Sequence, residues 1–375
     1  MFQYRIYPTK KQGHLLNETL EECRWLYNHL LERRKVAYEQ EGKSLSCFEQ
    51  QKTYGVLKQE RPRLSTVHSQ VLQNVAVRVD LAMKAFFRRA REHAEVPGFP
   101  RFKGKNRYDS LTYPQVPSGC EIKQGKLFLS KIGHLKIVLH RPLKGTPKTC
   151  TIHRSSTGKW FACFSCEVEP ERLPENDEQV GIDVGLLTFA TLSTGEEIAN
   201  PRFFRKEEKV LAKIQRKHSK LAKGTPERHE HRKRVARVHE RIKWRRDDFT
   251  HQESRRIVDR FGVICVEDLH VNRLVHNHCL SKSIYDASWS EFFSKLSCKA
   301  EEAGRKYVAV NPAYTSQDCS RCHHRQVMPL SERTYHCPCC LLICDRDLNA
   351  ALNIRAVGLH SLGLSLEAPS FSHGE

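Results

Sequence analysis

The chain of 375 residues is 39% hydrophobic and carries 63 Lys and Arg against 43 Asp and Glu, a formal net charge of +20 at pH 7. This length is enough for two or three domains with buried cores, so the chain is globular rather than a disordered tail. A charge of this size predicts a polyanionic partner, with nucleic acid as the natural candidate. The simpler alternative is a soluble basic protein that binds no polyanion.

Hydropathy and cysteine usage indicate the compartment. The sequence has no run of 18 apolar residues and no secretory signal, which predicts a cytoplasmic protein that does not contact a membrane. Six of the 15 cysteines lie between Cys319 and Cys344, in CxxC spacing. Metal binding therefore fits the cysteines better than disulfide formation does.

The first half of the chain predicts a helical block inside a β module. A short strand is expected at residues 2–7, and apolar residues at helical spacing then predict helices within residues 10–95, with the second helical region at 67–94. Alternation predicts four later strands, at residues 120–129, 135–139, 150–153 and 160–168. We expect the first strand to join these later strands, and residues 169–178 to form a linker.

After the linker, residues 179–192 predict a β-hairpin with a turn near 193–196. Residues 205–260 are strongly basic and helical, with a break at 224–226 and a narrow apolar stripe. We interpret this segment as a face that lies along phosphate backbones. The alternative is a charged hairpin that is merely solvated.

The first candidate acid is Asp183, in the predicted strand Val180-Gly181-Ile182-Asp183-Val184. Its side chain is expected on the face opposite the apolar residues. Gly181 and Gly185 carry no side chain, so they are expected to let a metal ion or a phosphate approach. A single Asp in a strand is more often only an exposed residue.

Two further acids stand at the ends of predicted elements. Glu267 follows the apolar run 263–266, which is typical of a buried central strand covered on both faces. Its neighbour Asp268 would point the other way, and we prefer Glu267. Asp347 lies where a helix begins, a position at which Asp is commonly a cap. The set of three acids favours a site for Mg²⁺ or Mn²⁺, and two such ions could cleave a phosphodiester.

Four cysteines give the strongest signal that needs no family knowledge. Cys319-x-x-Cys322 and Cys337-x-x-Cys340 are separated by 14 residues, one short of the usual range, and four thiolates at this spacing predict a tetrahedral zinc site. Because all four positions are filled by protein, the zinc is expected to be structural. Loss of zinc should disable Asp347 indirectly, since the acid follows the cluster closely. Cys339 and Cys344 are surplus, and either they lie around the ligands or they are incidental. His323 or His324 could substitute for one of the four ligands.

Several segments carry a resemblance to a known family. They are GIDVG at 181–185, VEDL at 266–269, SIYDASW at 283–289, the two CxxC pairs and DRDLNAALNI at 345–354. In this order and spacing the chain resembles the transposon-encoded TnpB family, which is similar to the type V CRISPR effectors. Supporting matches at 4–8, 27–28 and 98–102 extend the resemblance over nearly the whole chain. Cys344 departs from the family, which often has His there.

The resemblance implies an α/β multi-domain fold. Its parts would be a β-barrel-like wedge domain (1–9 and 96–172), a helical recognition insert (10–95), an RNase H-like RuvC nuclease domain (173–312 and 345–375) and a zinc ribbon (313–344). It also implies an RNA-guided DNA endonuclease of a transposable element. The guide RNA would derive from the transposon end, and double-stranded DNA beside a short adjacent motif would be cut.

Carried over position by position, the resemblance makes Asp183, Glu267 and Asp347 the catalytic residues that bind Mg²⁺ or Mn²⁺. It makes Cys319, Cys322, Cys337 and Cys340 the ligands of a structural Zn²⁺. We expect a monomer with one RNA. One alternative is a transposase that joins DNA ends, although the sequence shows no obvious helix-turn-helix and no His-x-His site with a tyrosine. The other is a guided DNA-binding repressor, which should lack at least one of the acids.

Overall fold

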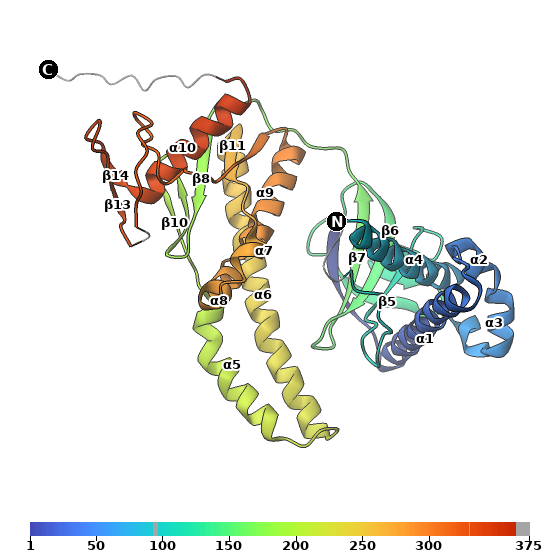
Figure 1. The fold of residues 1–375 in the computed structure, drawn as a ribbon. Helices are drawn as coiled ribbons and strands as arrows, with labels where there is room; N and C mark the ends of the chain where they lie inside the picture. Colours follow the sequence, from blue (N-terminus) through green and yellow to red (C-terminus); the bar gives the residue numbers. More distant parts are fainter. Residues whose placement is uncertain (93–96, 330, 365–375) are drawn as a thin grey trace. The chain divides into compact units, whose positions relative to one another are not determined.

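The computed structural model describes residues 1–92, 97–329 and 331–364. The chain divides into two compact units, Met1–Glu169 and Pro170–Glu375 (Figure 1). Residues 168–178 contain neither helix nor strand, so the predicted linker is confirmed at the boundary of the units. No helix in the described ranges is long and apolar enough to cross a bilayer.

The first unit contains a seven-stranded antiparallel sheet in the order β2-β6-β7-β1-β5-β4-β3. Its strands are β1 (Phe2–Tyr7), β2 (Ser110–Tyr113), β3 (Cys120–Lys123), β4 (Lys126–Leu129), β5 (Gly133–Val138), β6 (Thr146–Arg154) and β7 (Trp160–Glu167). The strand β1 pairs with both β5 and β7, which confirms that the first strand joins those after the helices. The Tyr113 hydroxyl donates to the Ser130 carbonyl at 3.2 Å, so the two ends of the sheet approach each other.

The helices of the first unit lie between β1 and β2 in the sequence. They are α1 (Lys10–Glu41), α2 (Cys47–Lys52), α3 (Tyr54–Glu60), the short 3₁₀ helix Pro62–Thr66 and α4 (Ser69–Arg91). Thr9 and Gln12 form a capping box that begins α1, and Gly42 in the left-handed conformation ends it. The predicted helical block is confirmed up to residue 92, and its last residues, 93–95, lie outside the described ranges.

Two strand predictions for the first unit need correction. Residues 120–129 are not one strand but a tight hairpin of β3 and β4. Gln124 and Gly125 both have positive φ, 49° and 71°, which is the backbone of a two-residue hairpin turn. The polar residues 123–126 mark this turn in the sequence, but the prediction of one strand runs across them. The strand β2 was not predicted, because four residues are too few to show a period.

The second unit contains a mixed five-stranded sheet in the order β10-β9-β8-β11-β12. Its strands are β8 (Gln179–Val184), β9 (Thr188–Leu192), β10 (Glu197–Ala199), β11 (Val263–Glu267) and β12 (Lys306–Val310). The predicted hairpin is β8 with β9, whereas the turn at 193–196 leads onward into β10. The strand β11 pairs in parallel with β8 and β12 and is buried along its whole length, as predicted.

Helices cover both faces of this sheet. One face packs with residues of α6 (Pro226–Arg260) and α9 (Trp289–Ala303), and also of α8 (His278–Ala287). The other face packs with α10 (Arg346–Ser361), whose Ile354 and Leu359 meet Cys265 and Val310. A short helix, α7 (Val271–Leu274), follows β11. The segment before α10 carries the two-stranded sheet of β13 (Thr334–His336) and β14 (Ile343–Asp345).

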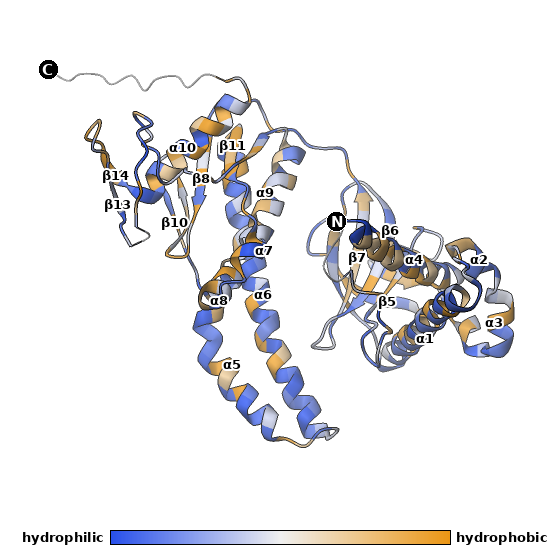
Figure 2. Cartoon of the chain, viewed as in Figure 1, coloured by the Kyte–Doolittle hydropathy of each residue, from blue (hydrophilic) through white to orange (hydrophobic). Residues whose placement is uncertain are grey.

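The basic segment forms a helical hairpin of α5 (Phe203–Lys220) and α6, with the break where it was predicted. Lys and Arg number 20 against nine Asp and Glu between Phe203 and Arg260. Its free end is mostly hydrophilic in Figure 2. At its base, the buried Asp286 carboxylate accepts hydrogen bonds from the Phe204 backbone N–H at 2.9 Å and from Arg246 at 2.8 Å. This carboxylate therefore fixes the hairpin to α8.

Gly181 determines how closely α10 can pack on β8. A Cβ atom at this position would lie 2.0 Å from the Ala351 carbonyl oxygen and 2.7 Å from the Arg355 backbone nitrogen. The backbone of α10 therefore fills the space above Gly181. The expectation that this glycine leaves room for a metal ion or a phosphate is wrong, because its space is needed by the helix.

We expect Gly181→Ala to destabilise the second unit by about 1–3 kcal/mol or more, because neither backbone can yield without moving α10. Gly55→Ala is the control, since nothing lies within 4 Å of a Cβ built at Gly55 in α3. Hydrogen exchange of the α10 amides would show faster exchange in the first variant alone. Equal protection of α10 in both variants would contradict this account of Gly181.

Candidate active site and metal centre

Two of the three candidate acids are brought together by parallel strand pairing. Ile182 in β8 lies opposite Val266 in β11, so Asp183 and Glu267 follow at adjacent positions on neighbouring strands. Glu267 is buried, whereas Asp268 is exposed and its backbone N–H donates to the Val310 carbonyl at 2.8 Å. The structure therefore directs Glu267 toward Asp183, which supports the preference for Glu267 over its neighbour.

The third acid approaches from α10. Asp345, not Asp347, is the N-cap of this helix, and its carboxylate accepts from the backbone N–H groups of Asp347 and Leu348. Capping is thus accounted for by Asp345, and the Asp347 carboxylate remains available for other contacts. A Cβ atom on Gly185 would lie 3.9 Å from Asp347 Oδ2, so Asp347 stands beside the end of β8.

The electrostatics link Asp183 to both of the other acids. Burial raises the pKa of Asp183 well above its usual value, and the charges of Glu267 and Asp347 raise it further, while Arg346 opposes the rise. Burial also raises the pKa of Glu267 and of Asp347. Each carboxyl therefore resists ionisation in the protein alone. A cation among them would relieve the repulsion, so the donor set fits a hard divalent ion such as Mg²⁺ or Mn²⁺.

Two residues that the sequence did not single out contact these acids. The Thr315 hydroxyl donates to Glu267 Oε1 at 2.8 Å, which orients the carboxylate and opposes the rise in its pKa. Arg333 Nη1 lies 3.4 Å from both carboxylate oxygens of Asp347. Neither residue belongs to a recognisable motif, because each reaches the site only through the folding of residues 312–345.

We expect the acidic cluster to cost stability when no divalent ion occupies it. In buffer without magnesium or manganese, and with the zinc retained, Asp183→Asn should raise the free energy of unfolding of the second unit by about 1 kcal/mol at pH 7.5. The pKa of the wild-type carboxyl is near 4 when the protein is unfolded and higher when it is folded. Its penalty is therefore absent below about pH 4, grows as the pH rises toward the pKa of the folded carboxyl, and is constant above it.

The gain from Asp183→Asn should therefore shrink when the pH is lowered from 7.5 to 5.5. Urea denaturation of wild type and variant at both values measures this difference. Asp268→Asn is the control, because Asp268 is exposed and should change stability little at either pH. A less stable Asp183→Asn variant at pH 7.5 would contradict the repulsion described here.

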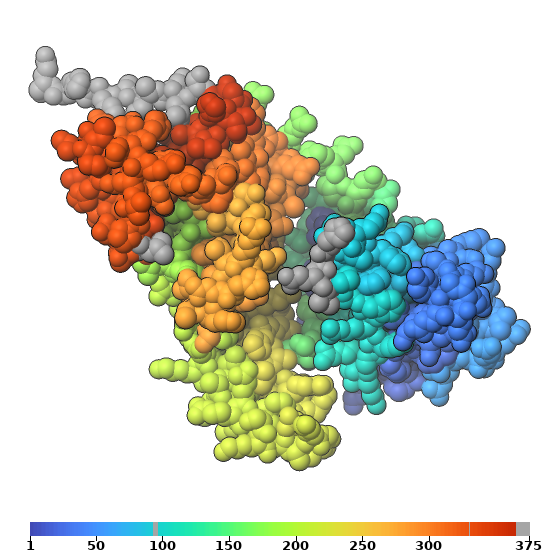
Figure 3. All heavy atoms as spheres, viewed as in Figure 1, coloured from blue at the N-terminus to red at the C-terminus, as the bar shows by residue number. Residues whose placement is uncertain are grey.

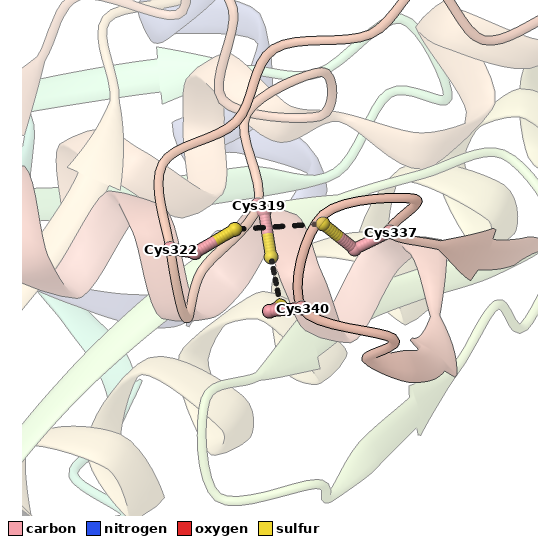
Figure 4. A group of neighbouring side chains, drawn as sticks. All are labelled: Cys319, Cys322, Cys337 and Cys340. Carbon is pink, nitrogen blue, oxygen red and sulfur yellow. Dashed lines mark hydrogen bonds between the residues drawn. The ribbon is translucent and has the colours of Figure 1, made fainter.

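The four predicted cysteines converge on one point (Figure 4). Their sulfur atoms all lie within 4.8 Å of one another, and two of the pairs are 3.5 Å apart. Zn–S bonds of about 2.3 Å in a tetrahedron require sulfur atoms about 3.8 Å apart, so the geometry fits zinc. Within the described ranges no other group of His, Cys, Asp or Glu is gathered as closely, and the three acids are spaced more widely.

The thiolate form that zinc needs is already favoured at Cys337. Burial alone would raise the pKa of this thiol, but hydrogen bonds with the backbone N–H groups of Cys340 and Cys339 and with the side chains of Cys322 and Cys319 together outweigh it, and the pKa falls to about 6. Cys339 is exposed, and Cys344 lies outside the group of four. Neither surplus cysteine is therefore a member of the cluster.

Residues 313–344, called here the four-cysteine segment, are joined to α10 by the side-chain amides of Asn349 and Asn353. Asn349 accepts from the Ser320 backbone N–H at 2.9 Å and donates to the Asp318 carbonyl at 2.8 Å. One turn later, Asn353 donates to the carbonyls of Thr315 and Asp318. Figure 3 shows this segment and α10 as one packed mass. The cluster therefore supports the helix that carries Asp347.

Three family models match the chain. They are described as "Probable transposase" (residues 163–278), "Cas12f1-like, TNB domain" (289–354) and "Helix-turn-helix domain" (1–43). The last name does not describe the fold of those residues, which contain β1 and a single unbroken helix, α1.

Curated relatives match over almost the whole chain. A Streptomyces pristinaespiralis protein is 36% identical over 96% of this chain and 89% of its own length, and Escherichia coli K12 InsQ is 28% identical over 95% and 92%. Both are named "Putative RNA-guided DNA endonuclease". A Sulfoacidibacillus thermotolerans protein named "CRISPR-associated endodeoxyribonuclease Cas12f1" is 28% identical over 58% of this chain and 56% of its own.

One solved structure is similar across both units. It is the Cas12f1-sgRNA-target DNA complex, which matches with a TM-score of 0.57 at 15% sequence identity and covers 92% of this chain and 83% of that chain. At this identity the match bears on the fold. It supports the mixed α/β architecture of the chain.

Proposed function

The chain belongs to the TnpB family of insertion-sequence proteins, and on that premise we propose that it is an RNA-guided DNA endonuclease. The observation that supports this proposal is that Asp183 and Glu267 follow at adjacent positions on paired strands and Asp347 stands beside the end of the first strand, in a strongly basic protein. Relatives named as RNA-guided DNA endonucleases support it across nearly the full length.

The strand arrangement supports an RNase H-like nuclease domain. Three antiparallel strands are followed by two parallel ones, and the first strand of the second unit, β8, lies at the centre. We assign the RuvC domain to residues 173–312 and 345–375, and the zinc ribbon to 313–344. We assign the wedge domain to residues 1–9 and 96–172, with the recognition insert at 10–95.

The three acids would hold Mg²⁺ or Mn²⁺, which would supply an activated water and neutralise the charge that develops on the phosphate. The protein's own groups prepare this site. Thr315 orients Glu267, and the Asp345 cap fixes the first turn of α10 and with it Asp347. The hairpin of α5 and α6 supplies cations that would attract the phosphate backbone.

The partners follow from the same premise. The protein would carry a guide RNA derived from the transposon end, as a monomer with one RNA, and act on double-stranded chromosomal DNA in a prokaryotic cytoplasm. Base pairing with the guide would select the target, while the protein would read backbone shape and a short adjacent motif.

The test is to purify the protein from cells that also carry its flanking DNA and to sequence the RNA that comes with it. We expect one discrete RNA that ends in a guide segment. Replacing that segment should redirect cleavage to a new matching DNA. Purification without a discrete RNA would remove guided targeting.

A transposase is the second candidate, because one family model bears the description "Probable transposase". The same three acids could in principle support strand transfer. Incubating the protein with transposon-end DNA and a plasmid target, without RNA, distinguishes the two. Joined products would favour the transposase, and their absence with guide-dependent cutting would favour the endonuclease.

A further inference from the structure

A basic and aromatic loop in the first unit remains without a function. Residues 97–107, called here the 97–107 loop, contain neither helix nor strand and connect the region after α4 to β2. The loop carries two phenylalanines and four cations: Phe99, Phe102, Arg101, Lys103, Lys105 and Arg107. Such interleaving of rings and cations is what a surface for unpaired nucleic acid requires.

Side chains from two helices hold the backbone of this loop. The side-chain amide of Asn28 in α1 forms two hydrogen bonds with the backbone of Lys103. It accepts from the Lys103 N–H at 2.7 Å and donates to the Lys103 carbonyl at 3.0 Å. Arg24 donates to the same carbonyl at 2.9 Å. Arg89 of α4 donates to the Pro97 carbonyl at 2.7 Å. The loop is therefore fixed before any ligand binds, which lowers the entropic cost of binding.

Most of the loop's own side chains are open to solvent. Phe102 is 54% exposed and Phe99 is 43% exposed. Arg101, Lys105 and Arg107 are exposed, and none of them forms a hydrogen bond or an ion pair through its side chain with the part of the chain that the structure describes. A rigid backbone that presents cations and exposed rings is prepared for an external partner rather than for the protein's own core.

We propose that the 97–107 loop binds an unpaired segment of the guide RNA. Bases would stack on Phe102 and Phe99, while Arg101, Lys105 and Arg107 would contact the phosphates. Stacking on aromatic rings between cations is how proteins hold single strands, because every base has a π face. A duplex would offer its phosphates but not its base faces, so single strands should be preferred.

The choice of RNA rests on the proposed function. Lys and Arg outnumber Asp and Glu by 30 to 15 in residues 1–169, so most of the net charge lies in the first unit. The strand to be cut must reach the three acids, and these belong to the second unit. The part of the guide RNA that does not pair with DNA stays unpaired before and after cleavage. It is therefore the single strand that the first unit would bind.

The direct test compares the full-length protein with its Phe102→Ala variant. Phe48→Ala is the matched control, since Phe48 is a phenylalanine of α2 that is 66% exposed and lies outside the loop. The probes are an unstructured oligoribonucleotide of about 25 nucleotides, the DNA of the same sequence and the RNA duplex. Fluorescence anisotropy measures Kd for each.

We expect Phe102→Ala to weaken binding of the single-stranded RNA roughly 5- to 150-fold, and Phe102→Trp to restore it. Arg101→Ala should lower the slope of log Kd against log salt by about 0.7 for each phosphate that Arg101 neutralises. Equal Kd values for Phe102→Ala and Phe48→Ala would overturn the proposal. A weakening confined to the DNA probe would overturn the assignment to RNA.

A second experiment separates this proposal from the proposed function. The photoreactive p-azidophenylalanine is introduced at position 102, cells carrying the flanking DNA are irradiated, and covalently attached RNA is sequenced. We expect the discrete co-purifying RNA to be crosslinked outside its guide segment. If that RNA co-purifies without crosslinking, the loop proposal fails and the guided function stands. If no discrete RNA is found, the guided function fails. The oligonucleotide test then still shows whether the 97–107 loop binds single-stranded RNA.

Discussion

We expect Asp183→Ala to abolish guide-directed DNA cleavage while leaving binding of the RNA and of the target unchanged. Burial raises the pKa of Asp183, and the charges of both Glu267 and Asp347 raise it further. Removing its carboxylate would remove a ligand for the metal ions that activate water and stabilise the phosphate, and the rate should fall by roughly 10³-fold or more.

Single-turnover cleavage and gel-shift binding of the same RNA-loaded preparations measure the two properties separately. Asp268→Ala is the matched control, because Asp268 is the exposed neighbour of Glu267 and does not act on Asp183. It should cut at nearly the wild-type rate, whereas Glu267→Gln should fail to cut. Full cleavage by Asp183→Ala would remove the acidic cluster from the mechanism. Loss of both cleavage and binding would point to misfolding instead.

The sequence predicts the main elements because their patterns are local. The break at residues 224–226 is marked by neighbouring Gly and Pro residues, and the structure confirms it. The hairpin of β3 and β4 is also marked locally, by the polar residues 123–126 between two apolar pairs, but the prediction of one strand runs across them. Gln124 and Gly125 have the positive φ angles of the turn.

The site is less local than the elements that carry it. Asp183 and Glu267 could be proposed from their strands, but the parallel pairing of β8 with β11 is what makes them neighbours. Arg333 and Thr315 reach the acids across the folded four-cysteine segment, and no spacing rule connects them to Asp347 or Glu267. Gly181 was interpreted as space for a ligand, because the sequence does not show that α10 occupies that space.

The second large effect concerns zinc. We expect removal of zinc to stop cleavage without touching the three acids, because the four-cysteine segment fixes the helix that presents Asp347. Asn349 and Asn353 bind the backbone of that segment, and Arg346 donates to the Pro329 carbonyl at 2.9 Å. Structural zinc in small zinc-finger peptides contributes about 10–16 kcal/mol, so the segment should unfold without it.

The measurement uses Cys319→Ser, with Cys339→Ser as the control, since Cys339 is an exposed cysteine outside the cluster. Cys319→Ser should lack bound zinc, become sensitive to proteolysis between residues 313 and 345, and cut as poorly as Asp183→Ala. Cys339→Ser should retain its zinc and its activity. Treating the wild type with a zinc-selective chelator in excess magnesium should give the same loss, which added zinc reverses.

Proteolytic sensitivity that appears on removal of zinc and is reversed by zinc is the result that separates a supporting role of the zinc from a catalytic one. Asp183→Ala cannot recover with any metal, because a ligand is missing, whereas the chelated wild type regains the fold that positions Asp347. Zinc-free protein that cuts DNA at the wild-type rate in magnesium would show that α10 keeps its place alone. In that case the packing of α10 on the sheet would hold the helix in place, and the hydrogen bonds of Asn349 and Asn353 would not be needed for its position.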